Sequence, residues 1–175
     1  MRRAAPPAVP DDPAEARKAA YVTALRWLAG REMSAARIRE RLGLRGFTPD
    51  VVEDTLARLT GNGAVDDTRA ALSAARSLVA VRLRGRHRAS RELERLGFGK
   101  DVAAEALGTI LSEVDESAVA ARLVRSRLRG RKTIADAADY KRIFDALLRR
   151  GFPSDLIRAA MEPYWRRGDG EEEGQ

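Results

Sequence analysis

The chain has 175 residues, a net charge of +7 and no cysteine, and few of its apolar residues are aromatic. Without cysteine there are no disulfides and no thiolate chemistry, and no stretch reaches the roughly eighteen apolar residues of a transmembrane helix. The N-terminal arginines are followed by prolines instead of an apolar segment, which argues against a secretory signal and favours a cytoplasmic protein. The positive charge favours a polyanionic partner, although a soluble protein that simply prefers arginine would show it too.

Glycine breaks and polar caps divide the sequence into nine helical segments, each with an apolar stripe at helical spacing. The expected N-caps include Ser34, Asp66, Asp115 and Ser154. The helices are expected at 13–29, 35–44, 49–60, 67–84, 86–96, 100–112, 115–128, 140–149 and 154–165. No stretch alternates apolar and polar positions with β-branched residues, so the sequence predicts an all-α fold.

One short phrase occurs three times and sets the order of these helices. The dipeptide Gly-Phe begins at Gly46, Gly97 and Gly151, each time just before the last helix of a set of three. A self-match with a period of roughly fifty residues is typical of a repeat protein. We therefore expect three tandem three-helix repeats forming an elongated, curved array, with each phenylalanine packing back onto its own repeat.

The repeats should depend on one another for stability. Their expected boundaries are 13–63, 64–114 and 115–165, between disordered tails at 1–12 and 166–175. A unit of about fifty residues is near the lower limit for independent folding, so each should pack against its neighbours or a partner. Leu96 and Leu148 are expected to face inward beside Leu93 and Leu147.

Two arginine-dense stretches occupy equivalent places, where the first helix of a repeat meets the second. They lie at 82–91 and 122–132. Pairing with a helix dipole explains one or two arginines at a helix end, whereas contact with phosphates or with an acidic protein surface explains a higher density. The candidate contact residues are Arg82, Arg84, Arg86, His87, Arg88, Arg91, Arg122, Arg125, Arg127, Arg129, Arg131 and Lys132.

Other polar residues predict no catalytic, metal or cofactor site. The glycines at 30, 85 and 130 are isolated and fit helix C-caps better than a phosphate-binding loop. His87 is the only histidine and there is no cysteine, so no zinc site is expected, and the cationic run around His87 makes it a poor general base. The acidic pairs at 66–67 and 115–116 open helices, which is capping chemistry, and the pair at 53–54 lies on an outer helix face.

Taken together and in order, these motifs resemble those of the RecX family, the regulatory partners of the RecA recombinase. The resemblance covers about residues 19–165. It is carried by Ser34, Ile38, Leu42, Gly46-Phe47, Val51-Val52, Leu56 and Leu59, by Asp66-Asp67-x-Arg69, and by Leu147-Leu148-Arg-Arg-Gly151-Phe152. The chain departs from the family pattern at Ala70 and Ala74, where aromatic residues are usual, and at Ala89, where isoleucine is usual.

The resemblance implies a non-enzymatic regulator of recombinational repair and the SOS response. It implies binding in the groove of the RecA–DNA filament and inhibition of RecA's ATPase, strand-exchange and coprotease activities, without catalytic residues or a cofactor. The expected partners are RecA and single- and double-stranded DNA through the basic face, with no membrane, and the chain is expected to be a monomer. Charge reversal at Arg84, Arg86 and Arg88 is expected to weaken filament binding.

Three alternatives belong to other classes. A sequence-independent DNA-binding protein of helix-turn-helix-like repeats would act without RecA and show a steep salt dependence. A helical scaffold would show no salt-dependent DNA binding. An enzyme would need a polar constellation that the sequence does not contain.

Overall fold

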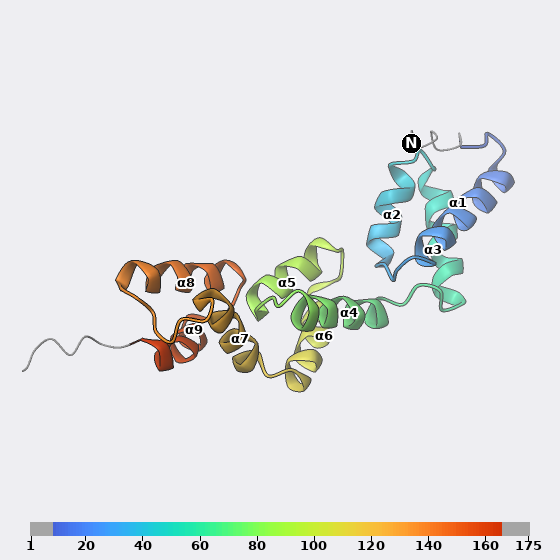
Figure 1. Cartoon of the computed structure of the whole chain (residues 1–175). Coiled ribbons are helices and arrows are strands. Elements are labelled where there is room, and N and C mark those ends of the chain that lie inside the picture. Colours follow the sequence, from blue (N-terminus) through green and yellow to red (C-terminus); the bar gives the residue numbers. More distant parts are fainter. Residues whose placement is uncertain (1–8, 166–175) are drawn as a thin grey trace, which may run out of the picture. The chain divides into compact units, whose positions relative to one another are not determined.

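The structure, a computed structural model, describes residues 9–165 and is all-α over that range (Figure 1). The helices are α1 Pro13–Leu28, α2 Ala35–Gly43, α3 Pro49–Gly61, α4 Asp67–Arg76, α5 Arg86–Arg95, α6 Lys100–Glu113, α7 Glu116–Leu128, α8 Ala137–Arg149 and α9 Ser154–Met161. A π-helical turn, η1 Ser77–Val81, extends α4, and a 3₁₀ turn, η2 Glu162–Tyr164, follows α9. The predicted all-α fold of tandem three-helix repeats is confirmed.

The described chain divides into two compact units, and the division passes through the middle three helices. The N-terminal unit comprises residues 9–73 and 93–103, and the C-terminal unit comprises 74–92 and 104–165. Each unit therefore contains one terminal set of helices together with the part of the middle set that packs against it. The repeat boundaries 13–63, 64–114 and 115–165 remain a prediction.

In the N-terminal unit, α1 and α2 both pack on α3. Ser34 begins α2 as predicted, since its Oγ accepts the backbone N–H of Arg37 at 3.1 Å. Ile38, Leu42 and Leu59 form the centre of the core and are fully buried. Val9 packs against this core and Asp12 caps α1, so residues 9–12 are ordered, contrary to the prediction for 1–12. The rest of the predicted tails, 1–8 and 166–175, lies outside the described residues.

In the C-terminal unit, α7, α8 and α9 pack on one another. The Asp115 side chain accepts the backbone N–H groups of Ser117 and Ala118, so Asp115 is the predicted N-cap of α7. Hydrogen bonds from Ser117 first and then from these N–H groups lower the pKa of Asp115. The buried core is Ala120, Leu123, Val124, Leu128, Ile134, Ile143, Leu147, Phe152, Ile157 and Met161.

The middle three helices bury many small side chains beside Leu93, Leu107 and Ile110. Their buried alanines are Ala70, Ala71, Ala75, Ala89, Ala103 and Ala106. Alanine buries less apolar surface than a larger apolar side chain, so these positions gain less from packing. Because α4, α5 and α6 are each divided between the two units, much of the stability of this set must come from its neighbours.

Several local predictions are wrong. Leu96 and Leu148 are 38% and 45% exposed, whereas Leu93 and Leu147 are buried as predicted. The helix expected at 67–84 continues only as the π-helical turn and ends at Val81, and α8 begins at Ala137, three residues early. Ser154 is the first residue of α9 and makes no capping hydrogen bond.

Candidate partner-binding surface

The structure places the Gly-Phe turn of one repeat against the start of the second helix of the preceding repeat. We call the first such contact joint 1; it lies within the N-terminal unit. Ser34 Oγ donates to the carbonyl of Leu96 at 2.6 Å, and the N–H of Ala35 donates to Asp67 Oδ1 at 2.8 Å. Asp67 opens α4, so an acidic residue of the second repeat caps a helix of the first.

Joint 2, within the C-terminal unit, repeats this geometry with other residue types. The N–H of Gly85 donates to the carbonyl of Arg150 at 2.9 Å, as Ser34 Oγ does to Leu96. The N–H of Arg86 donates to Glu116 Oε1 at 2.8 Å, as Ala35 does to Asp67. Glu116 opens α7, just as Asp67 opens α4.

The glycines of the repeated phrase are the contact points of both joints. Gly97 and Gly151 have φ of +89°, and Gly46 has φ of +90°, a region that side chains with a Cβ rarely adopt. A Cβ on Gly97 would lie 2.8 Å from Ser34 Oγ, and one on Gly151 would overlap the backbone of Arg88. A Cβ on Gly46 would meet only a Val9 methyl, at 3.8 Å.

The phenylalanines after Gly46 and Gly151 lie in the cores of their own repeats, as predicted. Phe47, Phe98 and Phe152 are all buried, with Phe152 fully so. Of the other glycines, two follow a helix end as predicted and one does not, and the C-cap residues themselves are Ala29 and Arg129. Gly30 and Gly130 follow the ends of α1 and α7, but Gly85 precedes α5, where a Cβ would overlap the backbone of residues 151–152.

Two of the candidate contact arginines, Arg86 and Arg88, contact the third repeat at joint 2, and a third, Arg84, lies beside them. Arg86 binds Glu116, whose side chain is only 5% exposed, through both Nε and Nη2 at 2.7 Å. Arg88 donates to Glu92 at 2.6 Å and to the carbonyl of Arg149 at 3.0 Å. Arg84 Nε lies 3.3 Å from Glu92 Oε1, although without hydrogen-bond geometry. These positive charges are therefore partly neutralised within the fold.

The charge balance around joint 2 remains positive. Burial opposes ionisation of Glu92, but the hydrogen bond from Arg88 and the nearby charges of Arg84, Arg88 and Arg82 outweigh it, so the pKa of Glu92 lies below its usual value. Burial, together with the charges of Arg84, Arg127 and Arg88, lowers the pKa of Arg150. Arg150 donates to the carbonyls of residues 82 and 83, which fastens the segment before α5 onto the third repeat.

The second arginine stretch includes one more structural residue. Arg131 donates to Asp139 Oδ2 at 2.6 Å, and Arg142 binds the other oxygen of the same carboxylate. The hydrogen bond from Arg131 is the largest influence on Asp139 and, against the effect of burial, holds the pKa of this carboxyl at about 2.

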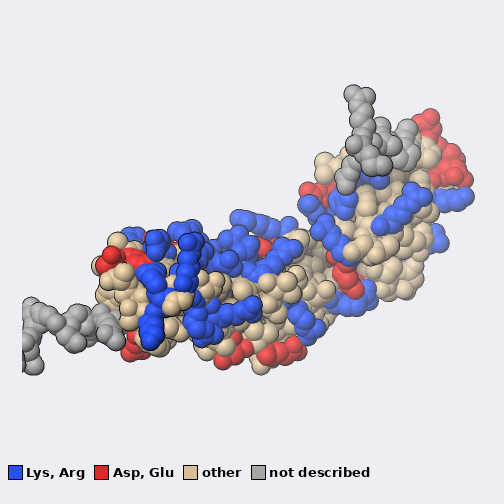
Figure 2. All heavy atoms as spheres, in the orientation of Figure 1, with Lys and Arg blue, Asp and Glu red and all other residues tan. Residues whose placement is uncertain are grey.

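The other basic side chains of the second stretch are exposed to solvent and have no ion-pair partner in the described structure. Arg122 and Arg125 lie three residues apart on α7, opposite the buried row of Ala120, Leu123 and Val124. Within residues 9–165 the following candidates are exposed and have no side-chain hydrogen bond or ion pair: Arg91, Arg122, Arg125, Arg127, Arg129 and Lys132. On the face of the C-terminal unit in view in Figure 2, Lys and Arg outnumber Asp and Glu. We call Arg122, Arg125 and Arg129 the α7 cationic surface.

The remaining candidates, Arg82 and His87, are exposed. The Arg82 side chain is near Glu92, while the backbone N–H of His87 donates to Gly151 and its ring is exposed. Among the described residues, no group of three or more histidines or carboxylates could hold a metal ion. No helix in this part of the chain is long and apolar enough to span a membrane.

These features define a protein of tandem three-helix repeats joined by capped helix ends. Residues 20–59 match the family model for the first three-helix domain of RecX, and residues 114–161 match that for its third. The chain belongs to the RecX family.

Relatives agree with this assignment, and solved structures share the fold. The chain is 33% identical over 146 residues to the regulatory protein RecX of Trichlorobacter lovleyi, covering 81% of this chain and 93% of the relative. It is 38% identical over 137 residues to that of Halorhodospira halophila, covering 78% and 83%. A crystal structure of RecX from Lactobacillus salivarius shares the fold, with a TM-score of 0.74 at 17% identity over 85% of this chain and 96% of that one. A second RecX crystal structure gives a TM-score of 0.73 at 22% identity over 86% and 73%.

Sequence reasoning missed the acidic half of both joints. Asp67 and Glu116 are the second residues of acidic pairs that were interpreted only as caps of their own helices. The available signal was that Asp66 and Asp115 alone suffice as N-caps, which left the second carboxylate of each pair without a role.

Proposed function

We propose that this protein regulates the RecA recombinase by binding the RecA–DNA filament, where it inhibits the ATPase, strand-exchange and coprotease activities without catalysing a reaction itself. Membership of a family whose relatives are named regulatory proteins supports this function. The observation that carries it in this chain is the α7 cationic surface, whose arginines have no partner within the described structure and can meet DNA phosphates or acidic protein.

The joints add a physical reason for potency. Each joint links a repeat to the next by capping hydrogen bonds and close backbone contact, so contacts made by neighbouring repeats are not independent. Once one repeat is bound, a linked repeat meets its own contact at high effective concentration. Weak contacts along a filament can then add up to tight binding by a monomer in the cytoplasm.

The test is the ssDNA-dependent ATPase of RecA, measured against rising concentrations of the protein and repeated with additional ssDNA. Inhibition well below one protein per RecA subunit that added ssDNA does not relieve is expected, because the protein then acts on the filament. Inhibition only at DNA-saturating amounts, abolished by added ssDNA, would contradict the proposal. That result would favour a DNA-binding protein that acts without RecA. The exposed arginines of the α7 cationic surface are compatible with that function too.

A further inference from the structure

A groove between α5 and α6 of the C-terminal unit is a candidate site of another kind. It has a volume of about 460 Å³, which is within the usual range for small-ligand sites. Its lining residues are Arg86, His87, Ser90 and Arg91 of α5, and Ala104, Leu107, Gly108 and Leu111 of α6. Apart from Arg86, none of these side chains takes part in joint 2 or the α7 cationic surface.

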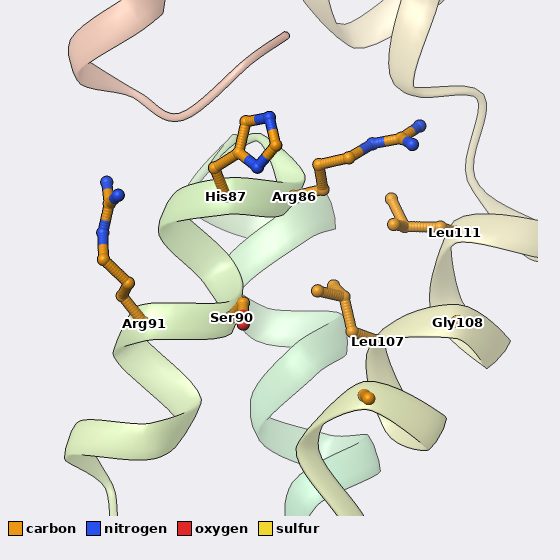
Figure 3. Close-up of a pocket in the computed structure, with 8 residues that line it drawn as sticks. Arg86, His87, Ser90, Arg91, Leu107, Gly108 and Leu111 are labelled. Atoms are coloured by element: carbon orange, nitrogen blue, oxygen red, sulfur yellow. The ribbon is translucent and has the colours of Figure 1, made fainter. Parts of the chain in front are cut away.

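The α6 wall of the groove is apolar, and its small residues leave space beside the leucines. Figure 3 shows Leu107 and Leu111 directed from α6 toward α5. Ala104 and Gly108 stand one helical turn apart on the same face, so no large side chain fills the space between the leucines. A Cβ added to Gly108 would meet no atom within 4 Å. The wall can therefore receive a large apolar side chain from outside.

The α5 wall carries positive charge. No aspartate or glutamate is among the described residues that line the groove. Arg91 and His87 are exposed, and Arg91 has no ion-pair partner in the described part of the chain. The groove thus combines one cationic wall with one apolar wall, and its occupant needs negative charge and an apolar group together.

We propose that this groove binds a short acidic peptide segment of a partner protein that carries one large apolar side chain among its carboxylates. The apolar side chain would cover the half-buried Leu111 and the exposed Ala104 and Gly108, since Leu107 is already buried, and the carboxylates would face Arg91 and His87. A nucleic-acid backbone supplies the charge but no aliphatic group for the α6 wall. The acidic end of this chain, from Asp169 to Gln175, also contains no apolar side chain. The site goes beyond the proposed action on RecA.

The probe is a short fluorescein-labelled peptide of aspartate, glutamate and glycine with one central phenylalanine, titrated with the full chain and followed by fluorescence anisotropy. A second peptide carries serine in place of phenylalanine, and a labelled oligothymidylate reports on nucleic acid. Gly108→Leu fills the groove, and Gly61→Leu is its control, because Gly61 is also a helical glycine with open space around it. Arg91→Glu reverses the charged wall, and Arg95→Glu does so on the same helix outside the groove.

We expect the phenylalanine peptide to bind at least about tenfold more tightly than the serine peptide. Gly108→Leu and Arg91→Glu should each weaken its binding about tenfold, while the two controls stay within about twofold. The proposal is overturned if neither peptide binds, or if the serine peptide binds as tightly as the phenylalanine peptide. It is also overturned if Gly108→Leu weakens peptide binding no more than Gly61→Leu does, or if the groove variants weaken binding of the oligothymidylate instead of the peptide. The assay contains no RecA, so its outcome is separate from that of the proposed function.

Discussion

The two joints solve the same problem with different side chains. At joint 1 a serine hydroxyl meets the carbonyl before the Gly-Phe turn, whereas at joint 2 the backbone N–H of Gly85 does so. At joint 1 the short Asp67 accepts one backbone N–H, whereas the longer Glu116 accepts the equivalent N–H and also a guanidinium. The two joints therefore share a geometry of capped helix ends and close backbone approach, and joint 2 adds ionic contacts to it.

The largest expected effect comes from adding a methyl group to the glycine of joint 2. Gly151→Ala should lower the free energy of unfolding by about 3 kcal/mol or more, because backbone strain at positive φ is added to overlap with Arg88. Gly46→Ala has the same strain without a close neighbour and should cost only about 1 kcal/mol. Gly97→Ala should lie between them, since its nearest neighbour is a side-chain oxygen that can shift. Urea unfolding of the three variants measures this order, and equal losses would show that the glycines are needed only for their backbone angle.

The acidic residues of the two joints should also differ, with the larger loss of stability at joint 2. Glu116→Ala removes a buried carboxylate that binds both the N–H and the guanidinium of Arg86, so we expect a loss of about 2 kcal/mol. Asp67→Ala removes one capping hydrogen bond and should cost about 1 kcal/mol. Thermal unfolding of both variants provides the comparison. A larger loss for Asp67→Ala would contradict the view that joint 2 is the more strongly held.

In the third repeat, carboxylates of the repeat itself hold the start of the second helix, and this predicts a dependence on pH. The folded pKa of Asp139 is about 2, below its ordinary value of 3.8, so its contribution is present at neutral pH and lost as the pH falls from about 4 to about 2. The contribution is about 2 kcal/mol. The free energy of unfolding of Asp139→Asn, compared with the unsubstituted chain over this pH range, should show the two curves converging at low pH. A constant difference would mean that the Arg131–Asp139 pair does not depend on the charge of Asp139.

The helix caps could be predicted from the sequence, whereas the contacts between repeats at the two joints could not. Ser34, Asp66 and Asp115 cap helices as expected because a cap needs only its own neighbours along the chain. Leu96 lies at the turn where joint 1 forms, and periodicity alone could not show that its carbonyl is used there while its side chain stays exposed. Gly30 and Gly85 were both predicted to be helix C-caps, but it is Ser34 that takes the place of Gly85 in joint 1, since both donate to the carbonyl before a Gly-Phe turn.

The candidate contact residues fall into two groups, those that pair with a carboxylate of the fold and those that do not. The sequence could not separate the two groups, because the carboxylates lie in distant segments. A run of arginines in sequence carries no sign of which members meet a carboxylate from a distant segment. Arg86 meets Glu116 thirty residues away, and Arg131 meets Asp139 across the loop before α8. Arg122 and Arg125 have no such partner in the described structure and remain as candidates for contact.

The smallest expected effect on stability is on the α7 cationic surface, where the largest effect on activity is expected. Arg122→Glu/Arg125→Glu should change the free energy of unfolding by no more than about 0.5 kcal/mol, because both side chains are exposed and make no ion pair. Arg88→Glu, by contrast, places a carboxylate beside Glu92 at joint 2 and should be clearly destabilising. Chemical unfolding distinguishes the two, and equal losses would mean that the α7 arginines also hold the fold.

The most direct test of the central claim is inhibition of the RecA ATPase by Arg122→Glu/Arg125→Glu, compared with the control Arg26→Glu/Arg31→Glu on exposed arginines of the N-terminal unit. We expect the α7 variant to need at least about tenfold more protein for the same inhibition, while the control inhibits as the unsubstituted chain does. Undiminished inhibition by a folded α7 variant would contradict the claim that this surface acts on the filament.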